Sequence, residues 1–175
     1  SASPFTTPEL TAATSALRTP HSALASTFSS TSNAIGTGRP TIASQHALMW
    51  RLHNTVAYQR GLTDGETTAT EALEKGSGVC QDHAHLFIAC ARVLKIPARY
   101  VSGYLYCENL NDNVHRASHA SHAWAEAYVD DLGWVSFDTT NSRCATEAYV
   151  RLAVAFDYAG AAPIRGFRRG GGVEE

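Results

Sequence analysis

Cys80 has the residue type and the position of a catalytic nucleophile. The segment Gly76-Ser77-Gly78 breaks the chain just before Val79-Cys80, where a helical pattern starts. Unpaired backbone N–H groups and the positive end of the helix dipole meet in the first turn of a helix, and both favour the thiolate form of a cysteine. The same N–H groups can hold the oxyanion of an acyl-transfer intermediate. By position alone, however, such a cysteine is more often a small buried hydrophobe.

Two further residues, His122 and Asp138, favour the catalytic interpretation. They lie at the outer ends of a predicted β-hairpin whose turn is 130–133. If Tyr128 pairs with Trp134 across this turn, His122 and Asp138 lie on one face of the sheet as diagonal neighbours, with Cα atoms roughly 7 to 8 Å apart. A slip of one residue would place them on opposite faces. A thiolate, an imidazole base and a carboxylate that orients the imidazole are the three parts of an acyl-transfer triad.

The segments around these residues resemble the core of the bacterial transglutaminase-like proteins. The matching blocks are G-V-C-Q-D-H at 78–83, the stretch 95–104, S-H-A-W-A-E at 121–126 and G-W-V-S-F-D at 133–138. The resemblance spans roughly residues 41–169 and implies a papain-like fold in which Cys80, His122 and Asp138 form the triad. Thr139 stands where that family usually has proline.

The family resemblance also implies parts that this sequence lacks. A β-rich domain precedes the core in that family and a further strand closes it, and neither has a counterpart here. We therefore expect a catalytic domain taken from a longer protein, with the β-rich domain missing at its N-terminal side.

The expected chemistry is a covalent thioester on Cys80, formed by attack on a peptide or carboxamide carbonyl. Water or an amine then resolves it, and hydrolysis by a protease or amidase is favoured because nothing indicates a dedicated amine site. The alternative is a catalytically silent module that only binds peptides. We expect no cofactor and no calcium requirement, since no dense set of carboxylates is present.

Several histidines raise the question of a metal site. His115, His119 and His122 resemble a zinc cluster by number, but the loop offers no acidic or cysteine partner and the triad needs His122. His83 and His85 are two residues apart, so a helix would not direct both at one metal. The sequence therefore predicts no metal site.

The remaining candidate residues have structural interpretations. Asp82 in the first turn of a helix complements the helix dipole. We expect Trp124 and Trp134 to be core or cleft walls. Trp50 and Tyr58 are candidates for a second oxyanion donor, although packing in the core is favoured for both. Cysteines 80, 90, 107 and 144 form no C-x-x-C pair and are expected to be mostly reduced, with Cys90 buried.

The elements that must position these residues follow from the hydrophobic pattern. Residues 41–56, with a stripe that includes Met49 and Trp50, predict a helix, as do 68–76 and 80–94. Beyond Pro97 the period changes, and 99–106, 123–129 and 133–138 predict strands. A short helix near Thr146 and an extended piece at 154–158 follow. Helices first and antiparallel strands afterwards indicate an α+β fold, with the nucleophile helix packed on the sheet.

Length and composition limit the class of protein. The 175 residues fit one domain, and 44% hydrophobic residues are enough for a core. A net charge of −2 and a pI of about 6.4 disfavour a nucleic-acid partner. Neither an apolar run of membrane-spanning length nor a signal pattern is present, so we expect a cytoplasmic protein without a membrane partner that acts on peptides or proteins. The predicted divisions are a helical arm or linker at 1–40, the catalytic core at 41–169 and a Gly-rich tail at 170–175.

Overall fold

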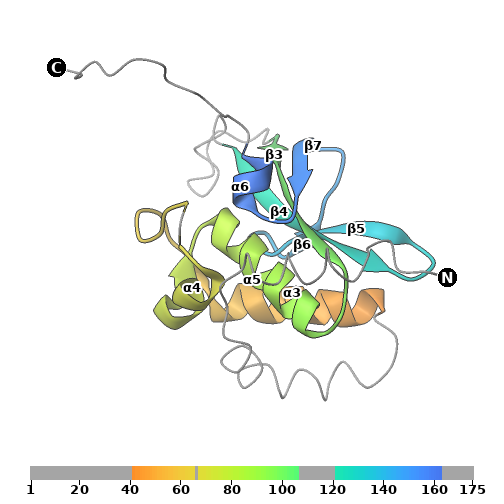
Figure 1. Ribbon diagram of the computed structural model, residues 1–175, viewed down its shortest axis with the longest axis horizontal. Helices are drawn as coiled ribbons and strands as arrows, with labels where there is room; N and C mark the ends of the chain where they lie inside the picture. The colour runs from red at the N-terminus through yellow and green to blue at the C-terminus, as the bar shows by residue number, and fades with distance from the viewer. Residues whose placement is uncertain (1–40, 66, 107–120, 163–175) are drawn as a thin grey trace.

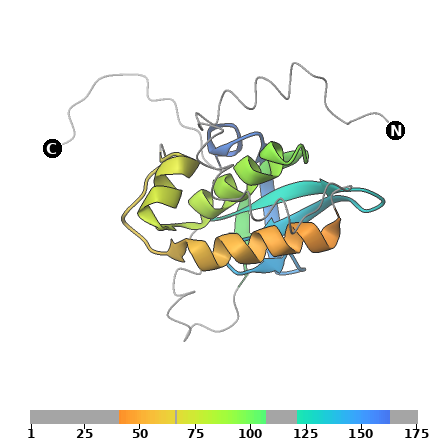
Figure 2. The same ribbon diagram turned by 90° about the horizontal axis from the view of Figure 1, so that it is seen from below.

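The fold is a helical layer packed on an antiparallel sheet. The computed structural model describes residues 41–65, 67–106 and 121–162. Helices come first and pack on one side of a five-stranded sheet (Figure 1, Figure 2). These helices are α3 (Ile42–Thr55), α4 (Ala69–Lys75) and α5 (Cys80–Val93). The structure confirms the α+β architecture predicted from the order of hydrophobic patterns.

The sheet has the strand order β6-β5-β4-β3-β7, and all neighbours are antiparallel. Its strands are β3 (Ala98–Leu105), β4 (His122–Val129), β5 (Gly133–Asp138), β6 (Arg143–Cys144) and β7 (Tyr149–Ala155). A separate parallel pair, β1 (Ala57–Tyr58) and β2 (Ser77–Gly78), joins the chain after α3 to the chain entering α5. A one-turn helix, α6 (Tyr158–Ala161), follows β7.

The hydrophobic core lies between the helices and the sheet. Along β4, the small side chains of Ala123, Ala125 and Ala127 face the helices and are buried there. The rings of Phe87 on α5 and Phe137 on β5 stack with centroids 5.1 Å apart. Because side chains alternate along a strand, the intervening β4 residues project from the opposite face. The candidate histidine at the start of β4 belongs to this second set.

Local sequence signals fix where α4 and α5 begin. Thr68 and Glu71 form a capping box at the start of α4. At the start of α5, the carboxylate of Asp82 accepts a hydrogen bond from the backbone N–H of Val79 at 2.8 Å. A Cβ on Gly78 would lie 2.7 Å from Oδ2 of Asp82, so only glycine leaves room for this cap.

Four expectations about the elements are wrong. Trp50 is 64% exposed and Tyr58 is 38% exposed, so neither packs in the core. The buried face of α3 runs through Gln45, Leu48, Met49 and Leu52, so it includes the predicted Met49 but not Trp50. The predicted short helix near Thr146 is a turn, and the following strand β7 starts earlier than expected.

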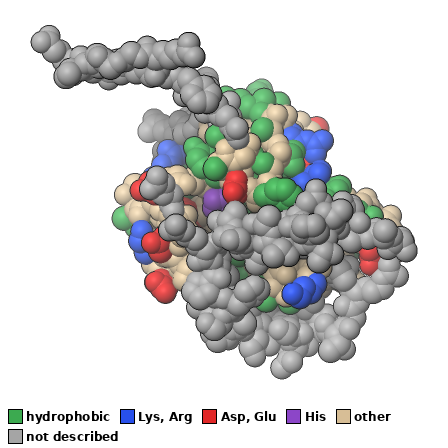
Figure 3. Space-filling view, viewed as in Figure 1, with side chains coloured by type: hydrophobic (Ala, Val, Ile, Leu, Met, Phe, Trp, Pro, Cys, Tyr) green, Lys and Arg blue, Asp and Glu red, His purple; other side chains and the backbone are tan. Residues whose placement is uncertain are grey.

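Some expectations lie outside the described residues. These are the arm at 1–40, the tail at 170–175 and the loop that holds His115 and His119. Across the part of the chain that is described, no helix has the length and apolar character needed to cross a membrane. On the face shown in Figure 3, Lys and Arg side chains are dispersed among acidic and apolar ones.

Candidate active site

Cys80 is the first residue of α5, as predicted, and is partly buried. The short ladder of β1 and β2 holds the chain that leads into it, with the Gln59 N–H donating to the carbonyl of Gly78 at 2.8 Å. Asp82 caps the same turn and also accepts from the Thr63 hydroxyl at 2.6 Å. Asp82 therefore holds the start of the helix, and the first turn of a helix has backbone N–H groups without partners inside the helix.

The predicted hairpin register is confirmed. Tyr128 pairs with Trp134, and this places His122 and Asp138 on one face of the sheet. Nε2 of His122 lies 2.7 Å from Oδ2 of Asp138. The Cys80 sulfur is close enough to the imidazole to contribute to the rise of its pKa. His122 thus lies between the thiol and the carboxylate, the order that triad chemistry requires.

Asp138 is the most heavily bonded side chain of the site. It is fully buried. Its Oδ2 accepts from His122, from Nδ2 of Asn141 at 2.6 Å and from the Tyr149 hydroxyl at 2.7 Å. Its Oδ1 accepts from the backbone N–H of Asn141 at 3.2 Å. These contacts fix the carboxylate toward the imidazole.

Two of these partners were missed in the sequence. Asn141 follows Asp138 by three residues. Asp side chains often accept a hydrogen bond from a backbone N–H a few residues later in a turn, and this signal could have indicated Asn141 as a partner of Asp138. Tyr149 comes from β7 at the far edge of the sheet, so only the tertiary fold brings its hydroxyl to Asp138.

The pKa values of His122 and Asp138 are set by burial and by hydrogen bonding. Burial by itself lowers the pKa of His122, but the hydrogen bond to Asp138 and the nearby Cys80 sulfur outweigh it and raise the pKa to about 10. Burial by itself raises the pKa of Asp138, yet the hydrogen bonds from His122, Asn141 and Tyr149 hold it below its usual value. The favoured state is an imidazolium beside a carboxylate.

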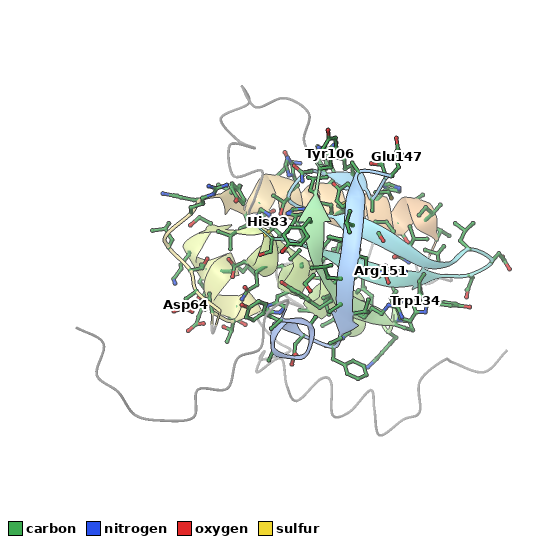
Figure 4. The ribbon with its side chains drawn as sticks, turned by 90° about the horizontal axis from the view of Figure 1, so that it is seen from above. Asp64, His83, Tyr106, Trp134, Glu147 and Arg151 are labelled. Carbon is green, nitrogen blue, oxygen red and sulfur yellow. The ribbon has the colours of Figure 1, made fainter. Side chains whose placement is uncertain are left out.

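His83 lies one turn after Cys80 and is fully buried between the helices and the sheet, as Figure 4 shows. Its Nε2 lies 3.1 Å from the carbonyl of Val56, and its Nδ1 lies 3.0 Å from the Thr140 hydroxyl. Since a carbonyl only accepts, Nε2 carries the proton and the Thr140 hydroxyl donates to Nδ1. Burial lowers the pKa of His83, so this neutral ring joins the start of α5 to the end of β5.

His85 also has a structural hydrogen bond. Its Nε2 accepts from the backbone N–H of Tyr158 at 3.3 Å, and burial lowers its pKa. Neither His83 nor His85 contributes to a metal cluster, and within 41–65, 67–106 and 121–162 no three His, Cys, Asp or Glu side chains could hold a metal ion.

Aromatic side chains line the candidate site where it borders the sheet. Trp124 is 2% exposed, and its ring centroid lies 6.1 Å from that of His122 and 5.3 Å from that of Tyr149. The interpretation of Trp124 as a buried wall is confirmed. Trp134 is half-buried at the far end of the hairpin, where Arg99 stacks on it at 4.0 Å.

The remaining cysteines differ from Cys80. Cys90 is buried as predicted, and burial raises its pKa to about 12. Cys144 is half-buried, lies 3.6 Å from Nε2 of His46 and has a pKa that burial raises. Cys107 lies outside the described residues.

Comparison with known proteins identifies one family. Residues 29–139 match the model of the transglutaminase-like superfamily. An uncharacterized protein of Mycobacterium leprae is 37% identical over 118 residues, which cover 67% of this chain and 42% of the relative. The chain thus spans less than half the length of this relative.

Two solved structures are similar in fold and sequence. A candidate cysteine protease from Cytophaga hutchinsonii is 32% identical with a TM-score of 0.63, over 79% of this chain and 45% of that protein. The periplasmic domain of TgpA from Pseudomonas aeruginosa, bound to ethylmercury, is 25% identical with a TM-score of 0.51, over 72% of this chain and 47% of that one. These similarities agree with the papain-like α+β core that the sequence motifs predict.

Proposed function

The chain belongs to the transglutaminase-like superfamily, and on this premise we propose that Cys80, His122 and Asp138 act as a catalytic triad on peptide or carboxamide bonds. The observation that carries the proposal is the continuous line of contacts from the thiol through the imidazole to the carboxylate. The similarity of this chain to a candidate cysteine protease from Cytophaga hutchinsonii supports the proposal that it is a thiol enzyme.

In the first step, the Cys80 sulfur attacks the substrate carbonyl carbon. A C–S bond forms, and the electrons of the carbonyl π bond move to the oxygen, which the backbone N–H groups at the start of α5 stabilise. Because Nε2 of His122 is bonded to Asp138, Nδ1 is the nitrogen that faces the reaction. It gives its proton to the leaving nitrogen, the C–N bond breaks, and an amine or ammonia departs from a thioester.

In the second step, water attacks the thioester. Nδ1 of His122, now neutral, takes a proton from the water while the new C–O bond forms. The C–S bond breaks, and the thiolate of Cys80 and the imidazolium of His122 are restored. An amine that replaces water would give transfer instead of hydrolysis. We favour hydrolysis because the described residues include no evident site for an amine acceptor.

Asp138 contributes by holding His122 rather than by touching the substrate. A carboxylate bonded to one ring nitrogen fixes the tautomer and the orientation of the imidazole. The donors from Asn141 and Tyr149 keep that carboxylate ionised and in place. The triad therefore operates as a unit in which the fold sets each position.

The proposal is tested by incubating the protein with a pool of glutamine-containing peptides, with and without a primary amine. Shorter fragments indicate a protease, ammonia release without cleavage indicates a deamidase, and amine incorporation indicates a transglutaminase. Cys80→Ala is the matched control and is expected to lose all three reactions. Peptide binding with no reaction in the parent protein would instead support the silent binding module.

Other aspects of the whole protein remain proposals. We propose a peptide or protein substrate, no nucleic-acid or membrane partner and a cytoplasmic location. The β-rich domain that the family resemblance implies is proposed to belong to the longer protein. The domain boundaries at 40 and 169 also stay predictions.

A further inference from the structure

The backbone places Arg60 beside the nucleophile. Strands β1 and β2 run parallel, with Tyr58 paired to Gly78. The ladder is extended by the hydrogen bond from the Gln59 N–H to the Gly78 carbonyl. Neighbouring strands lie about 4.8 Å apart. Arg60 leaves this ladder one residue after Gln59, and Cys80 leaves it two residues after Gly78, so the two residues emerge close together.

The side chain of Arg60 is directed toward the same region. Its Nε–H donates to the Tyr58 hydroxyl at 3.2 Å, and its guanidinium carbon lies 6.0 Å from the centroid of the Tyr58 ring. The Tyr58 ring in turn lies 6.5 Å from the ring of His83, one turn after Cys80 on α5. The hydrogen bond to Tyr58 raises the pKa of Arg60, so the guanidinium is positively charged where it lies against this ring.

The guanidinium of Arg60 is exposed, and within 41–65, 67–106 and 121–162 one of its donors, Nε–H, is engaged. Among the described residues, its only bonding partner is the Tyr58 hydroxyl, and no carboxylate is paired with it. Asp64, at the outer edge of the same loop (Figure 4), instead accepts from the Thr67 hydroxyl. Arginine presents a planar fork of donors that matches both oxygens of a carboxylate.

We propose that Arg60 is a carboxylate-binding residue for the substrate, so that the site prefers acyl substrates with a carboxylate close to the reacting carbonyl. The inference rests on the proposed function of Cys80. The carboxylate can belong to an acidic side chain next to the reacting bond or to the end of a short peptide chain. Tyr58 acts with Arg60 by holding the guanidinium on the side of the nucleophile.

The test measures kcat/KM for two series of peptides. In the first series, Glu and its neutral isostere Gln are compared at each position that flanks the reacting residue, with both peptide ends blocked. In the second, peptides without acidic side chains carry either a free or an amidated C-terminus. An exposed ion pair of good geometry should raise kcat/KM for the peptides with the carboxylate by about 3- to 10-fold in one of the two series. This preference should decline as the salt concentration rises.

Two variants assign the preference to Arg60. In Arg60→Gln, the ratio of kcat/KM for the acidic and neutral peptides should fall to about one, whereas Arg60→Lys keeps part of the preference because it keeps the charge. Arg51→Gln on α3 is the matched control and should keep the parent's ratio.

Two results would overturn the inference while the proposed function stands. One is thioester formation in the parent protein without an acidic preference in either series. The other is an equal loss on both peptides in Arg60→Gln. Absence of any thioester in the parent protein would instead overturn the proposed function and the inference together.

Discussion

Tyr149→Phe removes one hydrogen bond from Asp138 and leaves the ring in place. The hydroxyl donates to Oδ2 of the buried carboxylate at 2.7 Å, while the ring keeps its edge contact with Trp124. Hydrogen bonds to charged groups contribute about 1.5 to 3 kcal/mol. Because Tyr149 is only half-buried, we expect the free energy of unfolding to fall by about 1 to 2 kcal/mol at pH 7.

The pH dependence of this loss has a definite sign. The folded-state pKa of Asp138 is lowered, so its ionised form contributes stability that is present above the unfolded pKa of about 3.9 and is lost as pH falls through the folded pKa. Removing a donor raises the folded pKa. The difference between Tyr149→Phe and the parent is therefore full at neutral pH and shrinks below about pH 4.

Urea unfolding of Tyr149→Phe, measured at pH 7 and at lower pH, checks this prediction. Tyr104→Phe is the control, because the Tyr104 hydroxyl is exposed and has no hydrogen-bond partner among the described residues. We expect the control to stay within about 0.5 kcal/mol of the parent. A Tyr149→Phe variant as stable as the control, or a loss that grows as pH falls, would contradict a stabilising hydrogen bond from Tyr149 to the ionised Asp138.

Further predictions concern the triad itself. Asp138→Asn should keep the fold, checked by circular dichroism, and lower turnover by about 10⁴-fold, the loss seen for the equivalent change in a serine protease; turnover near the parent's would contradict a triad. NMR of labelled histidine should find His122 as an imidazolium at pH 7, since its pKa is raised to about 10, and the stability from its pairing should be present below about pH 6.5 and lost as pH rises through 10. A neutral His122 ring at pH 7 would contradict that state. Iodoacetamide at neutral pH should label Cys80 faster than Cys90 and Cys144, whose pKa values burial raises, as peptide mapping can measure. Equal labelling would remove the distinction.

The parts of the site that could be predicted from the sequence are those with local signals. Cys80 follows a glycine-rich turn into a helix, and His122 and Asp138 are joined by one tight hairpin whose register follows from alternation. Residues that depend on distant packing were not predictable. Tyr149 reaches Asp138 only because β7 crosses to the far edge of the sheet, and its segment lacked a clear strand signal at its start.

The errors on α3 have a similar cause. The sequence stripe through Trp50 is a plausible buried face because it contains the largest side chain. The structure buries Gln45 instead, because its side-chain amide donates to the carbonyl of Tyr128 at 3.1 Å on the hairpin. A polar residue with a partner from a distant strand cannot be recognised by hydrophobic periodicity. The same limit applies to Arg60, whose position depends on the pairing of β1 with β2.

The most direct test of the account is to trap the acyl-enzyme. The protein is mixed with the glutamine-containing peptide pool, quenched in acid within the turnover time and examined by intact mass spectrometry and peptide mapping. We predict a mass increase that maps to Cys80, is released by hydroxylamine as a thioester would be, and is missing in Cys80→Ala. An adduct on another residue, or peptide turnover that persists in Cys80→Ala, would contradict the assignment of Cys80 as the nucleophile.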